Sequence, residues 1–150
     1  MKHRFTTNEG IELIKNFEGF SSEVYKDVVG LYTIGYGHLI TKDDDRDTFG
    51  KGINMFEGEE LLKKDLFKSE RAVLRLVNVP LSDGQFNALV SFCFNLGSGS
   101  LQRSTLRQKV NRGEYEDVGN EFLKWIYAGG KIFKGLVRRR KAEREMFLEG

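Results

Sequence analysis

Two carboxylic acids and one hydroxyl group lie close together in the first quarter of the chain, at Glu18, Asp27 and Thr33. Hydrolysis of a glycosidic bond needs two carboxyl groups that flank the bond, one protonated and one ionised. A threonine hydroxyl beside Asp27 would help that carboxylate to hold a water molecule. On spacing alone the alternative stays open that these are ordinary surface carboxylates on a helix end and a turn.

A helix must position the first of these groups. Apolar residues from Ile11 to Phe17 recur with helical spacing and predict a helix that begins with a capping box of Thr6 and Glu9 and ends at Gly19. Glu18 then lies in the last turn, where the partial negative charge of the helix end disfavours a second negative charge. With the apolar Phe17 next to it, we expect Glu18 to keep its proton.

A β-hairpin must position the other two groups. Residues 24–40 are rich in β-formers and interrupted by glycines, which predicts a hairpin that turns near Gly30 and continues into an irregular strand. Asp27 and Thr33 are six residues apart. They face each other on one side of the hairpin if the turn holds an odd number of residues.

The rest of the chain is predicted to be helical. A long amphipathic helix is expected over residues 56–77, with Asn54 and Glu57 as its cap and Pro80 after its end. Further start and stop signals are Ser82 with Gln85, Gly97, Ser104, Gly113 and the Gly129–Gly130 turn. The layout predicts one α+β domain with a hairpin-containing lobe at about residues 12–55, a linking helix and an all-helical lobe at about residues 80–150. We expect the binding site in a cleft between the lobes.

Three separated stretches resemble the phage-type lysozymes, glycoside hydrolase family 24. The run FEGFSSEVYKDVVGLYTIGYGHLIT has that family's order of Glu, eight residues, Asp, five residues and Thr, met here by Glu18, Asp27 and Thr33. The stretches LSDGQFNALVSFCFNLGSG (residues 81–99) and WIYAGGKIFKGLVRRRKAE (residues 125–143) are also similar to the family, and the likeness covers about residues 5–148.

The resemblance implies a lysozyme-like fold and a muramidase (a lysozyme-type glycoside hydrolase). Such an enzyme cuts the β-1,4 bond between N-acetylmuramic acid and N-acetylglucosamine in bacterial peptidoglycan, which makes peptidoglycan the expected partner and host lysis the expected role. Glu18 would be the general acid, while Asp27 and Thr33 would hold the attacking water, as inversion requires. A lytic transglycosylase, which uses one glutamate, and a wall-binding module without activity are the alternatives.

Three further residues are predicted to bind substrate: Gly37, His38 and Asn95. For His38 the resemblance also implies a structural ion pair with Asp65 on the long helix, which we favour over a direct chemical role. Phe94 and Trp125 could line a glycan cleft, although aromatic residues at helical spacing are more often core.

No cofactor and no metal are expected. Asp43, Asp45 and Asp47 fit three positions of a calcium loop, but Thr48 stands where that loop needs glycine and Asn54 where it needs glutamate. The histidines His3 and His38 and the lone Cys93 are too scattered for a zinc site. Cys93 is predicted to be a small core residue, because it lies within an apolar helix face.

The charge and hydropathy of the sequence limit which further partners and which location we expect. The net charge is +2, and no nucleic-acid motif is visible, so no nucleic-acid partner is expected. The basic segment from Lys131 to Arg144 is interpreted first as a solvated helix face, and second as a surface that attracts anionic outer-membrane lipid. No signal peptide or membrane span is visible. We therefore expect accumulation in the host cytoplasm, and the resemblance to phage-type lysozymes implies release to the wall by a separate holin. We also expect a monomer.

Overall fold

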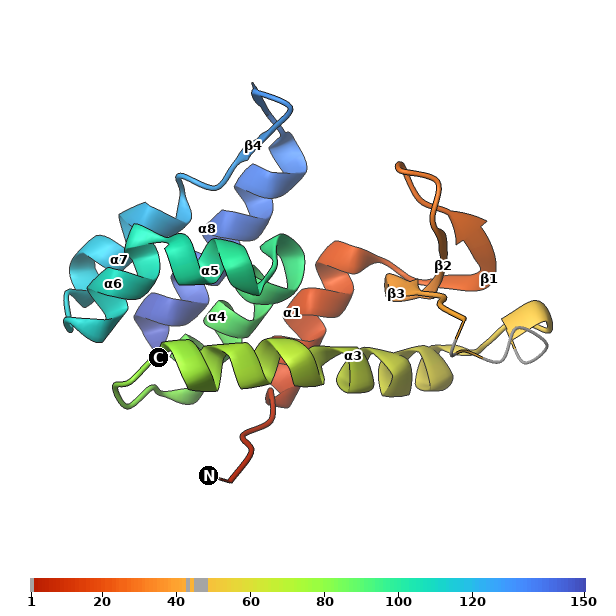
Figure 1. The fold of residues 1–150 in the computed structure, drawn as a ribbon, viewed down its shortest axis with the longest axis horizontal. Helices are drawn as coiled ribbons and strands as arrows, with labels where there is room; N and C mark the ends of the chain where they lie inside the picture. The colour runs from red at the N-terminus through yellow and green to blue at the C-terminus, as the bar shows by residue number, and fades with distance from the viewer. Residues whose placement is uncertain (1, 43, 45–48) are drawn as a thin grey trace. The chain divides into compact units, whose positions relative to one another are not determined.

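The computed structural model describes residues 2–42, 44 and 49–150, and the chain divides into two compact units. We call Ile14–Leu66 the hairpin unit, and Met1–Leu13 together with Phe67–Gly150 the helical unit. The elements in chain order are α1 (Asn8–Glu18), β1 (Ser21–Lys26), β2 (Tyr32–Gly35), β3 (His38–Leu39), α3 (Met55–Leu76), α4 (Asp83–Leu96), α5 (Ser98–Arg103), α6 (Thr105–Asn111), α7 (Tyr115–Phe122), β4 (Tyr127–Ala128), β5 (Lys131–Ile132) and α8 (Lys134–Glu149) (Figure 1). The predicted α+β class is confirmed.

The sheet of the hairpin unit is antiparallel, with strand order β1–β2–β3 (Figure 1). Tyr25 lies opposite Thr33 and Lys26 opposite Tyr32, and an irregularity in β1 separates these pairs from the pair of Ser21 with Gly35. A small apolar core supports the sheet. Its buried members are Ile34, Phe49 and Ile53, with Phe20, Ile40 and Leu61 packed against them.

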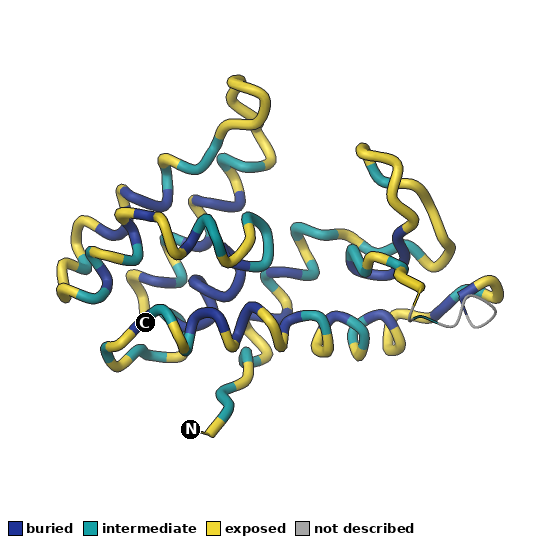
Figure 2. The backbone as a smooth tube through the Cα atoms, in the orientation of Figure 1, coloured by how far each residue is buried: buried dark blue, intermediate teal, exposed yellow. Residues whose placement is uncertain are grey.

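The loop of the hairpin is open to solvent. Val28 is fully exposed, Val29 and Leu31 are largely exposed, and the trace is exposed along most of β1 (Figure 2). Only β2 is anchored in the core, because Thr33 and Ile34 on that strand are both buried. The position of Thr33 is therefore fixed by packing, whereas the loop that follows Asp27 depends on local hydrogen bonds.

The helical unit has a larger core. Helix α8 packs against α4 and α7, and aromatic side chains meet edge-on between these helices, with 5.8 Å between the ring centroids of Phe92 and Phe122. Cys93 on α4 is buried, and this burial raises the pKa of its thiol. The prediction of Cys93 as a core residue is confirmed. Trp125 contacts Phe92 at a centroid distance of 5.4 Å, so it too packs against the core.

Most predicted helix signals are confirmed. The amide of Asn54 donates to Glu57 Oε1 at 3.0 Å, and the amide of Glu57 donates to Asn54 Oδ1 at 2.8 Å. Ser82 and Gln85 form the same reciprocal capping box before α4. The observed long helix, Met55–Leu76, differs from the expected range by one residue at each end.

The predicted capping box of Thr6 and Glu9 is wrong. The backbone amide and the hydroxyl of Thr6 both donate to Glu70 Oε2, at 2.7 and 2.6 Å. Helix α1 begins one residue later than that box requires, and the hydroxyl of Thr7 donates to Glu9 instead, at 2.9 Å. A buried carboxylate from α3 competes for Thr6, and such a long-range partner leaves no local signal.

The expectation of a solvated basic face on the last helix is wrong for Arg139 and Arg140. Both side chains are buried, as is Glu143, while Lys134, Arg138 and Lys141 are exposed. The two guanidinium groups can be buried because the oppositely charged Glu143 is buried with them. Among the described residues, no helix combines the length and the apolar character that crossing a membrane requires.

Candidate functional site

Glu18, Asp27 and Thr33 all belong to the hairpin unit. Glu18 is the last residue of α1, as predicted, and Gly19 follows with φ of 71°. The amide of Gly19 donates to the Lys15 carbonyl at 3.0 Å, which closes the last turn. The left-handed glycine redirects the chain into β1, and Glu18 is left half-buried at the point where the helix ends.

Gly37 packs against the carboxyl group of Glu18. A Cβ atom added at Gly37 would lie 2.9 Å from Glu18 Oε1 and 3.7 Å from its Cδ. The φ of Gly37 is 77°, a conformation that side chains other than that of glycine rarely adopt. The turn between β2 and β3 therefore brings bare backbone against the carboxyl group, so Gly37 shapes the surroundings of Glu18.

Asp27 stands at the start of the hairpin loop, and its side chain folds back onto that loop. Its Oδ1 accepts hydrogen bonds from the amides of Val29, at 3.0 Å, and Leu31, at 2.9 Å. No described residue donates a hydrogen bond to Oδ2. Asp27 thus uses one oxygen to hold its own position, and no hydrogen bond from a described residue engages the other.

Thr33 lies on the same face of the hairpin as Asp27 but not directly opposite it. The Asp27 amide donates to the Leu31 carbonyl at 2.9 Å, while Thr33 is paired with Tyr25. Three loop residues separate Asp27 from Leu31, so the two candidates are diagonal neighbours. Thr33 is buried and its hydroxyl donates to the Leu31 carbonyl at 3.0 Å, which leaves the oxygen lone pairs as acceptors.

His38 forms the predicted pair with Asp65. Its Nδ1 lies 2.8 Å from Asp65 Oδ2, and its Nε2 lies 3.2 Å from Asp44 Oδ1. The hydrogen bond with Asp65 raises the pKa of His38, against the opposing effect of burial, and Asp44 adds to the rise. Because carboxylates occupy both ring nitrogens, the geometry favours the structural role of His38 over substrate binding.

Asp44 is a partner of His38 that the sequence analysis missed. Burial disfavours its ionised form, but hydrogen bonds from Thr41 and His38 outweigh that effect and lower its pKa. The signal was hidden because Asp44 stands in a run of aspartates that could be interpreted only as a loop.

The calcium hypothesis for Asp43, Asp45 and Asp47 falls on residues outside the described ones. Within the described part of the chain, no cluster of histidine, cysteine and acidic residues could hold a metal ion.

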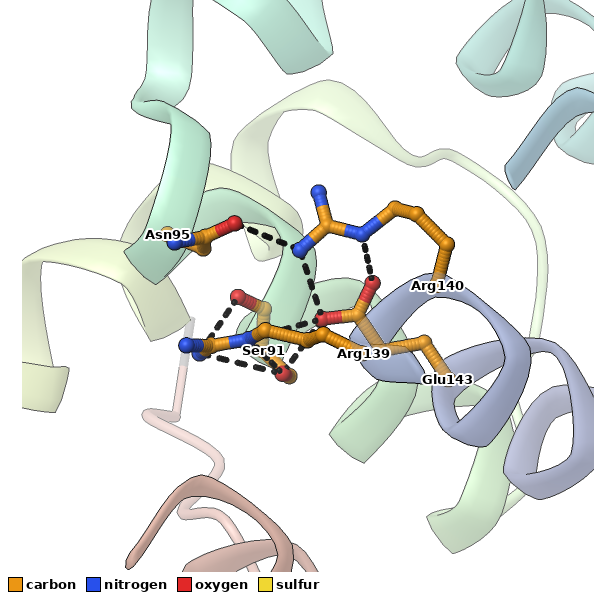
Figure 3. A network of polar contacts seen from close by, with 5 residues as sticks. All are labelled: Ser91, Asn95, Arg139, Arg140 and Glu143. Carbon is orange, nitrogen blue, oxygen red and sulfur yellow. Dashed lines mark hydrogen bonds and ion pairs between the residues drawn. The ribbon is translucent and has the colours of Figure 1, made fainter. Parts of the chain in front are cut away.

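Asn95 belongs to the helical unit and has a protein partner. Its Oδ1 accepts a hydrogen bond from Arg140 Nη2 at 2.6 Å (Figure 3). Arg140 in turn forms an ion pair with Glu143, with 2.9 Å between Nε and Oε1. The carbonyl oxygen of Asn95 is thus used within the protein, and only its amide group is left for substrate binding.

Glu143 is the centre of this buried network. The Ser91 hydroxyl donates to Glu143 Oε2 at 2.5 Å, and Arg139 Nε approaches the same oxygen at 3.4 Å (Figure 3). Burial raises the pKa of Glu143, although both guanidinium groups oppose that rise. Burial also lowers the pKa of Arg140 to about 10, against the opposing charge of Glu143. The network joins α4 to α8.

Comparisons with known proteins agree with this arrangement. The Phage lysozyme family model matches residues 15–143, which include all three candidate residues. An endolysin of Bacillus phage B103 is 43% identical over 143 residues, covering 94% of this chain and 53% of the relative. This chain therefore spans about half the length of that relative. An endolysin of Salmonella phage P22 is 37% identical over 142 residues, covering 95% of this chain and 97% of the relative.

Solved structures give the same result. A crystal structure of a P22 lysozyme mutant has a TM-score of 0.88 and 35% identity, covering 97% of this chain and 99% of that one. The muramidase domain of SpmX from Asticaccaulis excentricus has a TM-score of 0.85 and 33% identity, covering 98% and 99%. The family match, the relatives and the fold agree, and the chain therefore belongs to the phage lysozyme family.

Proposed function

We propose that this protein is an endolysin with muramidase activity, a glycoside hydrolase that cuts the β-1,4 bond between N-acetylmuramic acid and N-acetylglucosamine in peptidoglycan. The observation that carries the proposal is that the family match includes Glu18, Asp27 and Thr33 on one compact unit, each held in place by its own local structure. Glu18 protonates the leaving oxygen, and Asp27 with Thr33 holds the water that attacks the opposite face of the sugar.

The roles follow from what each side chain has left to offer. Oδ2 of Asp27 can accept a proton from water, because only Oδ1 is used by the loop amides. The Thr33 hydroxyl donates to the Leu31 carbonyl and can accept a hydrogen bond from the other O–H of that water. Glu18, half-buried at the end of α1 and next to the backbone of Gly37, takes the role of the general acid. An inverting mechanism needs about 6.5–9.5 Å between the two carboxyl groups.

The test is a turbidity assay on purified peptidoglycan with Glu18→Gln. Loss of the general acid is expected to reduce the lytic rate by about a thousandfold or more, while circular dichroism and the melting temperature stay unchanged. The matched control is Glu23→Gln, which removes an exposed carboxylate from β1 and is expected to keep full activity. A Glu18→Gln variant that lyses peptidoglycan at the normal rate would exclude the proposal.

Product analysis decides between the alternatives. Mass spectrometry of the released sugars is expected to show reducing ends, whereas an anhydro sugar would identify a lytic transglycosylase. Proton NMR of fresh product is expected to show the α-anomer first, because inversion of a β-bond gives that anomer. A β-anomer as the first product would exclude inversion, and absence of any product would leave a wall-binding module.

Three further expectations belong to the proposal. We expect the protein to accumulate in the host cytoplasm before a holin releases it, and fractionation of cells with and without a holin tests this. We also expect a monomer, which analytical ultracentrifugation tests. On α8, the exposed Lys134, Arg138 and Lys141 are the basic side chains that would attract anionic outer-membrane lipid, since Arg139 and Arg140 are buried. A variant with glutamine at those three exposed positions is expected to lose binding to phosphatidylglycerol vesicles.

A further inference from the structure

A pocket lies in the helical unit and is lined by none of the residues assigned to the proposed hydrolysis. Its volume is about 510 Å³, within the range of sites that hold small organic ligands. It lies between the N-terminal segment and the second half of α3. The six residues that line it are Lys2, His3, Phe67, Arg71, Leu74 and Arg75.

Cations surround this pocket without matching carboxylates. Lys2, Arg71 and Arg75 all line it, and no described residue forms an ion pair with any of the three. Arg71 and Arg75 are four residues apart on α3, so their charges are neighbours on one helix face. Like charges at that spacing repel each other and destabilise a helix. A bound anion would convert this repulsion into attraction to both guanidinium groups.

The acidic residue nearest in sequence to Arg71 has its hydrogen-bond partners in the N-terminal segment. Glu70 is buried and does not line the pocket. Its Oε1 lies 3.0 Å from His3 Nε2, while its Oε2 accepts two hydrogen bonds from Thr6. These contacts tie the N-terminal segment to α3 and hold His3 at the pocket wall. The Glu70 carboxylate therefore supports the pocket wall from behind and is not one of its lining groups.

The remaining wall is apolar and aromatic. The ring of Phe67 stacks on that of His3, with 4.2 Å between centroids and 19° between planes. The guanidinium carbon of Arg71 lies 5.9 Å from the Phe67 centroid. Phe67 is 41% exposed although it is a large apolar side chain. Together with Leu74 it offers the pocket a surface for a nonpolar group beside the cations.

We propose that this pocket binds a phosphate ester that carries an apolar group. Arginine recognises phosphate through paired hydrogen bonds, and Arg71 with Arg75 presents two such groups. Phe67 and Leu74 contact the apolar substituent of the ester. The site goes beyond the proposed hydrolysis, because it uses none of the residues assigned to that reaction.

The experiment is a titration of the full chain, labelled with ¹⁵N, with phenyl phosphate in low-salt buffer and NMR detection. Saturable shifts are expected at the amides of residues 67–75, with inorganic phosphate binding several-fold more weakly because it lacks the ring. Arg71→Gln combined with Arg75→Gln is expected to weaken phenyl phosphate binding about tenfold. Lys64→Gln combined with Lys68→Gln is the matched control, since it removes two exposed charges from the same helix outside the pocket.

The outcomes separate this site from the proposed function. Both double variants are expected to lyse peptidoglycan at the normal rate, so loss of phosphate binding and loss of hydrolysis are independent results. Soluble dihexanoyl phosphatidylglycerol, tested in the same way, distinguishes a lipid headgroup from a small soluble ester as the source. Shifts that do not saturate, or equal affinity in the arginine variant and the control, would overturn the inference.

Discussion

The carboxyl groups of Glu143 and Asp27 are both held by several donors, but they differ in how far each group is exposed to solvent. Glu143 is completely buried, and Ser91, Arg139 and Arg140 surround its oxygens. Asp27 is half-buried, and only its Oδ1 is engaged, by two amides of its own loop. The enclosed carboxylate of Glu143 links α4 to α8 through its ion pairs, whereas Asp27 keeps one oxygen, Oδ2, to which no described residue donates a hydrogen bond.

The two carboxyl groups also differ in how far along the chain their hydrogen-bond partners lie. Glu143 depends on partners about fifty residues away on α4 as well as on its neighbours along α8. Asp27 is oriented by residues two and four positions further along the chain. The comparison predicts that damage to Glu143 unfolds the protein, while damage near the hairpin mainly changes activity.

Glu143→Gln should give the largest loss of stability. The amide keeps the shape of the side chain but leaves two buried guanidinium groups without their counter-charge, which is expected to cost about 3–5 kcal/mol. For a chain of 150 residues that corresponds to a fall in Tm of about 10 °C. Urea denaturation measures it. Glu145→Gln, at an exposed site on the same helix, is expected to change stability by less than about 0.5 kcal/mol. Equal stability of the two variants would contradict the assignment.

Gly37→Ala should lower both the stability of the protein and its lytic rate. Alanine at a φ of 77° is expected to cost about 1–2 kcal/mol, and its Cβ would force Glu18 Oε1 away from a 2.9 Å approach. Displacement of the acid is expected to lower the lytic rate at least tenfold. Gly113→Ala is the matched control, because Gly113 has a φ of 73° with nothing within 4 Å of an added Cβ. It should lose similar stability and keep its activity; a normal rate for Gly37→Ala would show that this contact is dispensable.

Asp65→Asn should give a smaller, pH-dependent effect. The pKa of His38 is raised in the folded protein above its ordinary value of 6.5, so the charged pair stabilises fully below about pH 6.5 and weakens as pH rises through the folded pKa. We expect a loss of about 1–2 kcal/mol at pH 5.5 and a smaller loss at pH 9. Denaturation of both proteins at the two pH values measures it. A loss that grows with pH would show that neutral His38 is the stabilised form.

The part of the fold that local signals determine could be predicted from the sequence. The end of α1 at Glu18, the turn near Gly30 and the capping boxes of Asn54 and Ser82 depend on residues within a few positions of one another. Thr6 could not be predicted, because its partner Glu70 stands 64 residues away. Burial of Arg139 and Arg140 was missed for the same reason, since charged residues indicate a solvated face until their partners are known.

The candidate site followed a similar pattern. Spacing and resemblance selected Glu18, Asp27 and Thr33, and the odd number of loop residues correctly placed the last two on one face. The exact pairing could not be obtained, because the irregularity in β1 and the fold of Asp27 onto its own loop depend on three-dimensional context. Gly37 was selected for substrate binding, whereas the structure gives it a contact with Glu18.

Cys93 can serve as a chemical probe for opening of the helical unit. It is the one cysteine of the sequence, and it is enclosed in the core of the helical unit. A thiol reagent can reach it only when that core opens, so the rate of labelling under native conditions reports the opening of this unit alone. The protein thus carries an internal reporter for the opening of the helical unit.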